Sequence, residues 1–118
     1  MQLSISNRTV DDVAVVDCDG RLVFGEESAS LRDSVRSLLL LNKQIVLNLG
    51  GVSYIDSGGL GTLVALYTTA RNMSGSIRLA SLTQRVGDLL QVTKLVTVFE
   101  VYDTVDKAVK SFQKGAAA

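Results

Sequence analysis

The segment at residues 45–63, "IVLNLGGVSYIDSGGLGTL", changes from one hydrophobic pattern to another near its centre. Residues 44–49 form a short, almost continuous apolar run, which is typical of a central parallel strand covered on both faces. Further on, apolar residues recur with helical spacing, at Leu60, Leu63, Val64 and Tyr67. We therefore expect a helix over residues 57–72, with "DSGGLG" at residues 56–61 as the strand-to-helix junction.

The residues before this segment predict a hairpin and one helix. Apolar and polar residues alternate over 3–10 and again from Val13, and Asp11 and Asp12 between them suit a tight turn. We expect the second strand to end at Gly20. Helical spacing returns over residues 28–41, where the apolar positions are Leu31, Val35, Leu38 and Leu39.

The residues after the segment predict two more strand-and-helix units. "GSIRLA" at 75–80 and "TVFEVY" at 97–102 read as strands. Ser81 and Gln84 resemble a capping box that opens a short helix, and Asp103 is expected to cap a terminal helix. The order ββαβαβαβα predicts an α/β domain: an N-terminal hairpin, then alternating strands and helices, with a mostly parallel sheet flanked by helices. We expect one domain over residues 1–113 and a flexible C-terminal tail over residues 114–118.

Composition narrows the classes of function. Twelve Lys and Arg residues balance twelve Asp and Glu residues, so the net charge gives no reason to expect nucleic acid or an anionic membrane as a partner. Neither a signal peptide nor an apolar run of the ~20 residues that span a bilayer is found, which predicts a cytoplasmic protein.

The single Cys18 fits a reducing compartment and is expected to be a buried apolar side chain. The chain has no histidine, which excludes Ser-His-Asp and Cys-His nucleophiles and the usual zinc sites. No enzyme activity, metal or cofactor is expected.

The serine in "DSGGLG" has two main interpretations. Ser57 or Asp56 could be the N-cap of the helix, because a side-chain oxygen there accepts a hydrogen bond from a free backbone N–H. A cap alone does not explain Gly58 and Gly59, since glycine in a helix costs up to about 1 kcal/mol relative to alanine. The alternative is an acceptor hydroxyl, held at the carboxyl end of a parallel strand and left accessible by the glycines. A nucleophile elbow and a phosphate-binding Walker loop do not fit, because the required histidine and the Gly-Lys pair are absent.

These motifs resemble those of the STAS family, and in particular its free-standing members, the anti-sigma factor antagonists. The segment at 45–63 is similar to the family signature around a phosphorylatable serine, and "GRL" at residues 20–22 is similar to its second landmark. Element order and length agree over nearly the whole chain. The resemblance implies the STAS, or SpoIIAA-like, fold.

The resemblance also implies the site residues. Ser57 matches the phosphate acceptor of the family, and the residues implied in partner binding are Asp56, Ser57, Gly58, Gly59, Leu60, Gly61, Leu22 and Val23. Two of them depart from the family pattern. Gly58 stands where many members have a second serine or another small residue, and Val23 where many have an acidic or polar one.

The implied partner is an anti-sigma factor with a histidine-kinase-like ATPase fold, which binds the antagonist and phosphorylates its serine. The unphosphorylated antagonist binds this kinase and releases the sigma factor, and a PP2C-type phosphatase restores that form. We expect a monomer or weak dimer that catalyses nothing. Two alternatives stay open: a stressosome-type scaffold, which would form a large particle, and a STAS accessory subunit of a membrane transporter.

Overall fold

The structure, a computed structural model, describes residues 3–117, with side chains described as far as residue 113. It has the predicted element order, with a 3₁₀ turn, η1, added before the last strand. The elements are β1 (Leu3–Val10), β2 (Val13–Leu22), α1 (Glu26–Leu39), β3 (Gln44–Ile55), α2 (Ser57–Asn72), β4 (Ser76–Ala80), α3 (Gln84–Val92), η1 (Leu95–Thr97), β5 (Glu100–Tyr102) and α4 (Val105–Ala117).

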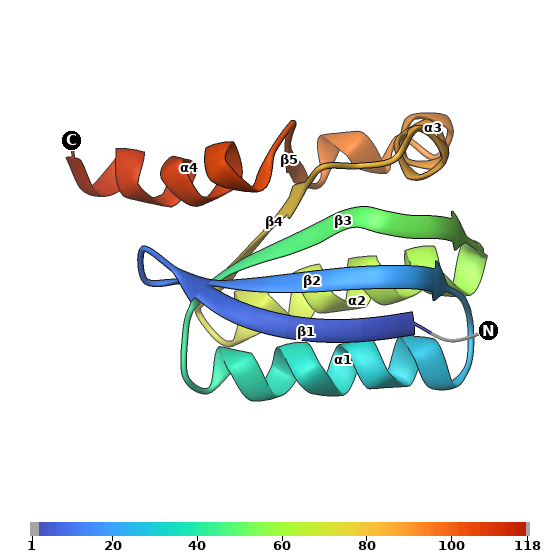
Figure 1. The fold of residues 1–118 in the computed structure, drawn as a ribbon, viewed down its shortest axis with the longest axis horizontal. Helices are drawn as coiled ribbons and strands as arrows, with labels where there is room; N and C mark the ends of the chain where they lie inside the picture. Colours follow the sequence, from blue (N-terminus) through green and yellow to red (C-terminus); the bar gives the residue numbers. More distant parts are fainter. Residues whose placement is uncertain (1–2, 118) are drawn as a thin grey trace.

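The five strands form one sheet in the order β1-β2-β3-β4-β5, in which only the β1–β2 pair is antiparallel. Asp11 and Asp12 make the expected hairpin turn with φ angles of 51° and 68°, a left-handed conformation that Asp tolerates better than most residues. Helices α1 and α2 lie on one side of the sheet, and α3 and α4 lie on the other (Figure 1). The predicted α/β fold with a mostly parallel sheet is confirmed.

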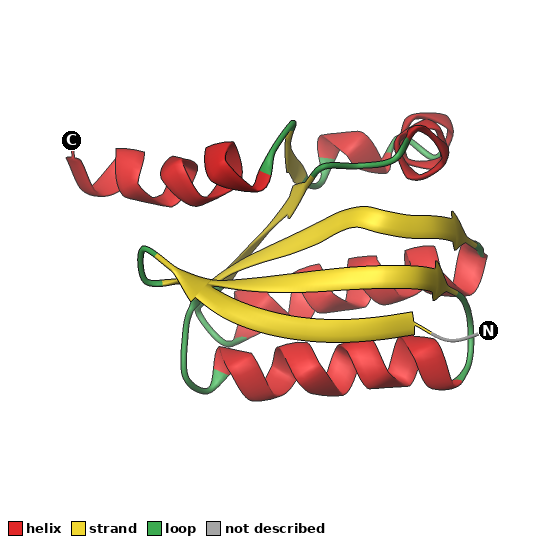
Figure 2. Ribbon diagram, in the orientation of Figure 1, coloured by secondary structure: helices red, strands yellow, loops and turns green. Residues whose placement is uncertain are grey.

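Two apolar clusters hold the layers together. The larger one joins the sheet to α1, α2 and α3, and the smaller one joins β2 and β3 to α4. Strand β2 is buried from Val13 to Val16 because helices cover both of its faces, as the helices and strands in Figure 2 show. Cys18 is 3% exposed, as predicted, and burial raises the pKa of its thiol to about 12.

Strand β3 extends six residues beyond the predicted end at residue 49. The pairing of β2 with β3 shifts register between Asp17 and Asp19 and again between Gly20 and Arg21, so β3 has an extra residue at each place. Because Gly50 and Gly51 fall at the first shift, they interrupt the apolar pattern without ending the strand. Strand β2 also continues beyond its predicted end at Gly20, as far as Leu22.

The predicted caps of the last two helices are wrong. Thr83, not Ser81, caps α3, because its hydroxyl accepts a hydrogen bond from the backbone N–H of Val86 at 3.3 Å. Thr104 accepts from the N–H of Lys107 at 3.1 Å, while Asp103 forms an ion pair with the Lys107 side chain. In both cases a threonine next to the helix is better placed than the residue that the pattern favoured.

The last strand, β5, covers only the second half of the predicted range 97–102, because Thr97 belongs to η1 and Val98 and Phe99 form a turn after it. At the C-terminus, the backbone of α4 continues through residue 117. Residue 118 and the side chains from residue 114 on lie outside the described part, so the flexible tail over 114–118 stays a prediction.

Candidate functional site

Asp56, the residue between β3 and α2, is the N-cap of α2. Its Oδ1 accepts a hydrogen bond from the backbone N–H of Gly59 at 2.7 Å. Both carboxylate oxygens also accept from the N–H of Phe24, at 3.2 Å each. The Gly59 hydrogen bond is the main cause that lowers the pKa of Asp56, and the Phe24 hydrogen bond adds to it. The carboxylate therefore ties the β2–α1 loop to the first turn of α2.

Ser57 is the first residue of α2, and its side chain is exposed. Because Asp56 makes the cap, the Ser57 hydroxyl is not needed for it. The hydroxyl lies at the N-terminal end of the helix, where the helix dipole stabilises added negative charge. Of the two interpretations of this serine, the geometry fits an accessible hydroxyl.

Two glycines bring the loop and the helix into close contact. A Cβ added at Gly59 would overlap the carbonyl oxygen of Leu22. A Cβ at Gly58 would lie 2.5 Å from Cβ of Phe24 and 3.0 Å from its Cα. By contrast, a Cβ at Gly61 would have no neighbour within 4 Å. Close approach of the Leu22–Phe24 segment thus explains Gly58 and Gly59 but not Gly61.

The structure brings the predicted site residues to one end of the sheet, because β2 and β3 are parallel and end side by side at Leu22 and Ile55. The backbone N–H of Asp56 donates to the carbonyl of Leu22 at 3.4 Å. The predicted residues divide by exposure. Exposed are Ser57 and Gly61; partly buried are Asp56, Gly58 and Val23; buried are Leu22, Gly59 and Leu60. The buried residues Leu22, Gly59 and Leu60 support the exposed part of the site.

Phe24 belongs to this cluster, although the sequence reasoning did not single it out. Its side chain is 81% exposed. In "RLVFG", at residues 21–25, it reads as one more apolar residue at the end of a strand pattern. The sequence did hold one signal of a loop here, because Gly25 ends the apolar run before α1. In the structure Gly25 adopts φ 114°.

A family model for the STAS domain matches residues 4–108, almost the whole chain and all of this site. The chain belongs to the STAS domain family. It spans about two thirds of the length of the curated relatives that it matches. One of these is the anti-sigma-B factor antagonist of Bacillus subtilis, 30% identical over 71 residues, which cover 60% of this chain and 65% of the relative.

Solved structures agree with this assignment. A candidate anti-sigma factor antagonist from Thermotoga maritima has a TM-score of 0.82 at 27% identity, with 91% of this chain and 92% of that chain covered. SpoIIAA, an anti-sigma factor antagonist of Bacillus, has been solved unphosphorylated and phosphorylated. The TM-scores are 0.70 and 0.71, at 15% and 16% identity, covering 95% and 92% of this chain and 99% of SpoIIAA in each form. Identities this low show a common fold and no more.

Tyr54, near the end of β3 in this STAS domain, contacts two arginines. The guanidinium carbons of Arg21 and Arg85 lie 5.0 Å and 4.5 Å from the centroid of its ring. Both arginines are exposed, so these cation–π contacts contribute about 0.5–1 kcal/mol each.

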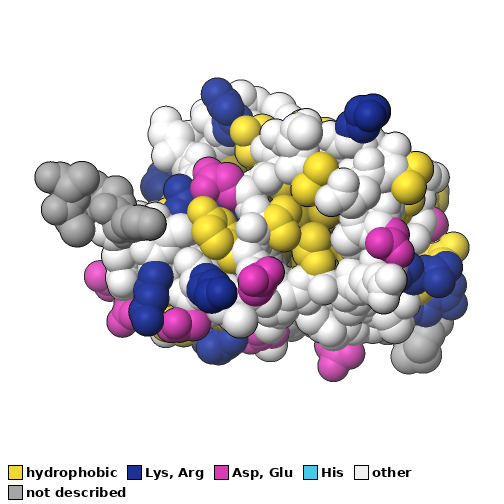
Figure 3. Space-filling model, turned by 90° about the horizontal axis from the view of Figure 1, so that it is seen from above, with side chains coloured by type: hydrophobic (Ala, Val, Ile, Leu, Met, Phe, Trp, Pro, Cys, Tyr) yellow, Lys and Arg dark blue, Asp and Glu magenta, His cyan; other side chains and the backbone are white. Residues whose placement is uncertain are grey.

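On the face formed by α3 and α4, basic and acidic side chains are interspersed around apolar ones (Figure 3). That face offers no large field of one sign.

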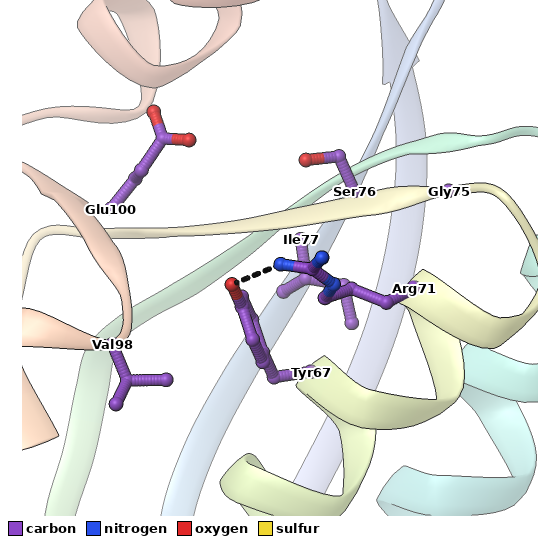
Figure 4. Close-up of a pocket in the computed structure, with 7 residues that line it drawn as sticks. All are labelled: Tyr67, Arg71, Gly75, Ser76, Ile77, Val98 and Glu100. Atoms are coloured by element: carbon purple, nitrogen blue, oxygen red, sulfur yellow. Dashed lines mark hydrogen bonds between the residues drawn. The ribbon is translucent and has the colours of Figure 1, made fainter.

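A separate cavity of about 350 Å³ lies between α2, the start of β4 and the residues Val98 and Glu100, and it contains none of the predicted site residues. Arg71 crosses it and donates a hydrogen bond to the hydroxyl of Tyr67 at 3.2 Å, as Figure 4 shows. Since the two residues are one turn apart on α2, this contact stabilises the helix surface. The cavity gives no independent reason to expect a ligand.

Neither a metal site nor a membrane span is found in the part of the chain that the structure describes. No three His, Cys, Asp or Glu side chains there lie close enough together to hold an ion. None of the helices described is long and apolar enough to cross a bilayer.

Proposed function

We propose that this STAS domain is an anti-sigma factor antagonist controlled by phosphorylation of Ser57. In the unphosphorylated state it binds an anti-sigma factor with a histidine-kinase-like ATPase fold, and the sigma factor is released. The same partner transfers phosphate from ATP to Ser57 and thereby ends the complex, and a PP2C-type phosphatase restores the binding form. The domain itself catalyses nothing.

The exposure of Ser57 carries this proposal. A kinase must bring its active site to the hydroxyl, and Ser57 is exposed at the start of α2. Asp56 fixes the backbone around it through three backbone hydrogen bonds from two N–H groups. The acceptor is therefore held in a defined position while its oxygen stays accessible.

The physics of the interface supports an on-off switch. A phosphoserine carries a charge of about −1.5 to −2 at pH 7. At the start of α2 this charge faces the positive end of the helix dipole, so it need not unfold the domain. Within an interface, a like-charge contact costs several kcal/mol, and about 3 kcal/mol already weakens binding roughly 150-fold.

The proposed partner-binding surface is the end of the sheet around Ser57. Its accessible part consists of Asp56, Ser57, Gly58, Gly61 and Val23. The buried residues Leu22, Gly59 and Leu60 hold this part in place.

Mapping the phosphate tests the assignment of the acceptor. The purified histidine-kinase-like anti-sigma factors of the source genome are incubated one at a time with the chain and ATP, and the phosphate is located by mass spectrometry. We expect one phosphate on Ser57, none on Ser57→Ala, and its removal by a PP2C-type phosphatase. Ser53→Ala is the matched control, because Ser53 is exposed nearby on β3 but donates its hydrogen bond to the carbonyl of Gly20. Phosphate on another residue, with Ser57 unlabelled, would contradict the proposal.

A further inference from the structure

Phe24 is a large apolar side chain that the fold leaves in solvent next to the acceptor serine. It is 81% exposed and belongs to the loop between β2 and α1. Singly exposed apolar side chains are common, and the chain has others, such as Leu41 at 86% and Val92 at 79%. Exposure alone therefore does not distinguish Phe24.

The backbone at Phe24 and at the residues on either side of it is held in place by hydrogen bonds. Its N–H donates to both carboxylate oxygens of Asp56 at 3.2 Å. The carbonyl of the preceding residue, Val23, accepts from the hydroxyl of Ser28 at 2.7 Å, and Ser28 is 4% exposed. The carbonyl of Gly25 accepts from the N–H of Ala29 at 3.0 Å. The loop is tied to both α1 and α2, so ordering it in a complex costs little entropy.

Phe24 also lies directly against the first turn of α2. A Cβ at Gly58 would be 2.5 Å from Cβ of Phe24 and 3.1 Å from its Cδ1. Gly58 follows Ser57 directly, so Phe24 lies against the same helical turn that carries the serine. An open cavity of about 330 Å³ beside the ring is lined by Gly58, Gly61, Thr62 and Arg32, among others.

From this geometry we infer that Phe24 is the apolar anchor by which the anti-sigma factor kinase recognises this antagonist. The ring enters an apolar pocket of the kinase while Ser57 lies at its active site, so Phe24 helps to determine which kinase binds. Aromatic side chains are enriched in interfaces, and a few anchored residues carry most of the binding energy. The inference rests on the proposed function and adds a residue that the family resemblance did not supply.

The test is the dissociation constant of the unphosphorylated chain with the anti-sigma factor that labels Ser57, measured by calorimetry without ATP. We expect Phe24→Ala to weaken binding roughly 30-fold and Phe24→Leu to lie between it and the natural chain. Leu41→Ala is the matched control, because Leu41 is equally exposed but follows α1 at the opposite end of the sheet; we expect a change below about twofold. Unfolding midpoints of all variants check that the fold is intact.

A second variant tests whether the position of the Phe24 ring matters as well as its presence. Gly58→Ala keeps Phe24 but forces it to move, because the new Cβ would overlap it, and we expect this variant to bind more weakly too. In a phosphorylation assay, Phe24→Ala should raise KM while the phosphate still appears on Ser57.

The outcomes distinguish the inference from the function on which it rests. If the natural chain binds and Phe24→Ala binds within about twofold of it, the anchor is contradicted and the proposed function stands. If the natural chain binds none of the histidine-kinase-like anti-sigma factors of the source genome, the proposed function fails, and the anchor fails with it.

Discussion

A single carboxylate joins the two halves of the site. Asp56 caps α2 through Gly59 and holds the N–H of Phe24, which lies 32 positions earlier in the chain. Aspartate and asparagine are about equally good N-caps, but only aspartate carries a charge that favours these hydrogen bonds. The ionised state of Asp56 should therefore contribute to the stability of the site.

Stability should depend on the ionisation of Asp56. Its pKa in the folded protein is lowered from the ordinary value of 3.8, so its contribution is complete above that value and is lost as the pH falls through the lowered pKa. We predict that Asp56→Asn, which lacks the charge, lowers the free energy of unfolding at pH 7 by less than Asp56→Ala does, and that it loses less stability than the natural chain between pH 5 and pH 2. Urea unfolding across this range measures it.

Asp17 serves as an internal reference in that experiment. The hydrogen bond from Arg8, with a further one from Asn48, lowers the pKa of Asp17 in both proteins, so its effect cancels in the comparison. Equal pH dependence of the natural chain and Asp56→Asn would contradict the role given to Asp56. As a positive control, Asp56→Ala should cost about 1 kcal/mol at pH 7, the usual effect of losing a cap.

At the scale of elements, α2 and its junction with β3 were predictable because two hydrophobic periods meet there. The helix begins at Ser57, as the spacing from Leu60 indicated. The length of β3 was not predictable, because the register shift at Gly50 and Gly51 interrupts the apolar pattern of the strand. The position of Phe24 was not predictable from the sequence either. It depends on which loop lies beside α2, and the pairing of β2 with β3 determines which loop that is.

The glycines at the start of α2 should respond in opposite ways to the same substitution. In Gly59→Ala the new Cβ would overlap the carbonyl of Leu22, and we predict a loss of about 1–3 kcal/mol in the free energy of unfolding. Gly61→Ala meets no neighbour and should stabilise the helix by up to about 1 kcal/mol. Urea unfolding of both variants measures the difference, and equal effects would show that α2 and the β2–α1 loop do not touch as described.

At the scale of the whole molecule, the fold holds the residues of the candidate site together at one end of the sheet. The sheet aligns the ends of β2 and β3, apolar clusters fix α1 and α2 beneath them, and the loop and first helical turn form a single surface. The site residues followed from the resemblance to the STAS family, whereas their division into exposed and buried ones required the structure. Phosphate at Ser57 should then change binding without changing the fold.

The most direct test compares the affinity of one anti-sigma factor for the chain before and after complete phosphorylation. We predict binding at least about 100-fold weaker after phosphorylation, with an unchanged circular dichroism spectrum. Ser57→Ala should bind like the unphosphorylated chain in the presence of ATP, and Ser57→Asp should bind weakly. Equal or tighter binding by the phosphorylated chain would contradict control of this STAS domain through Ser57.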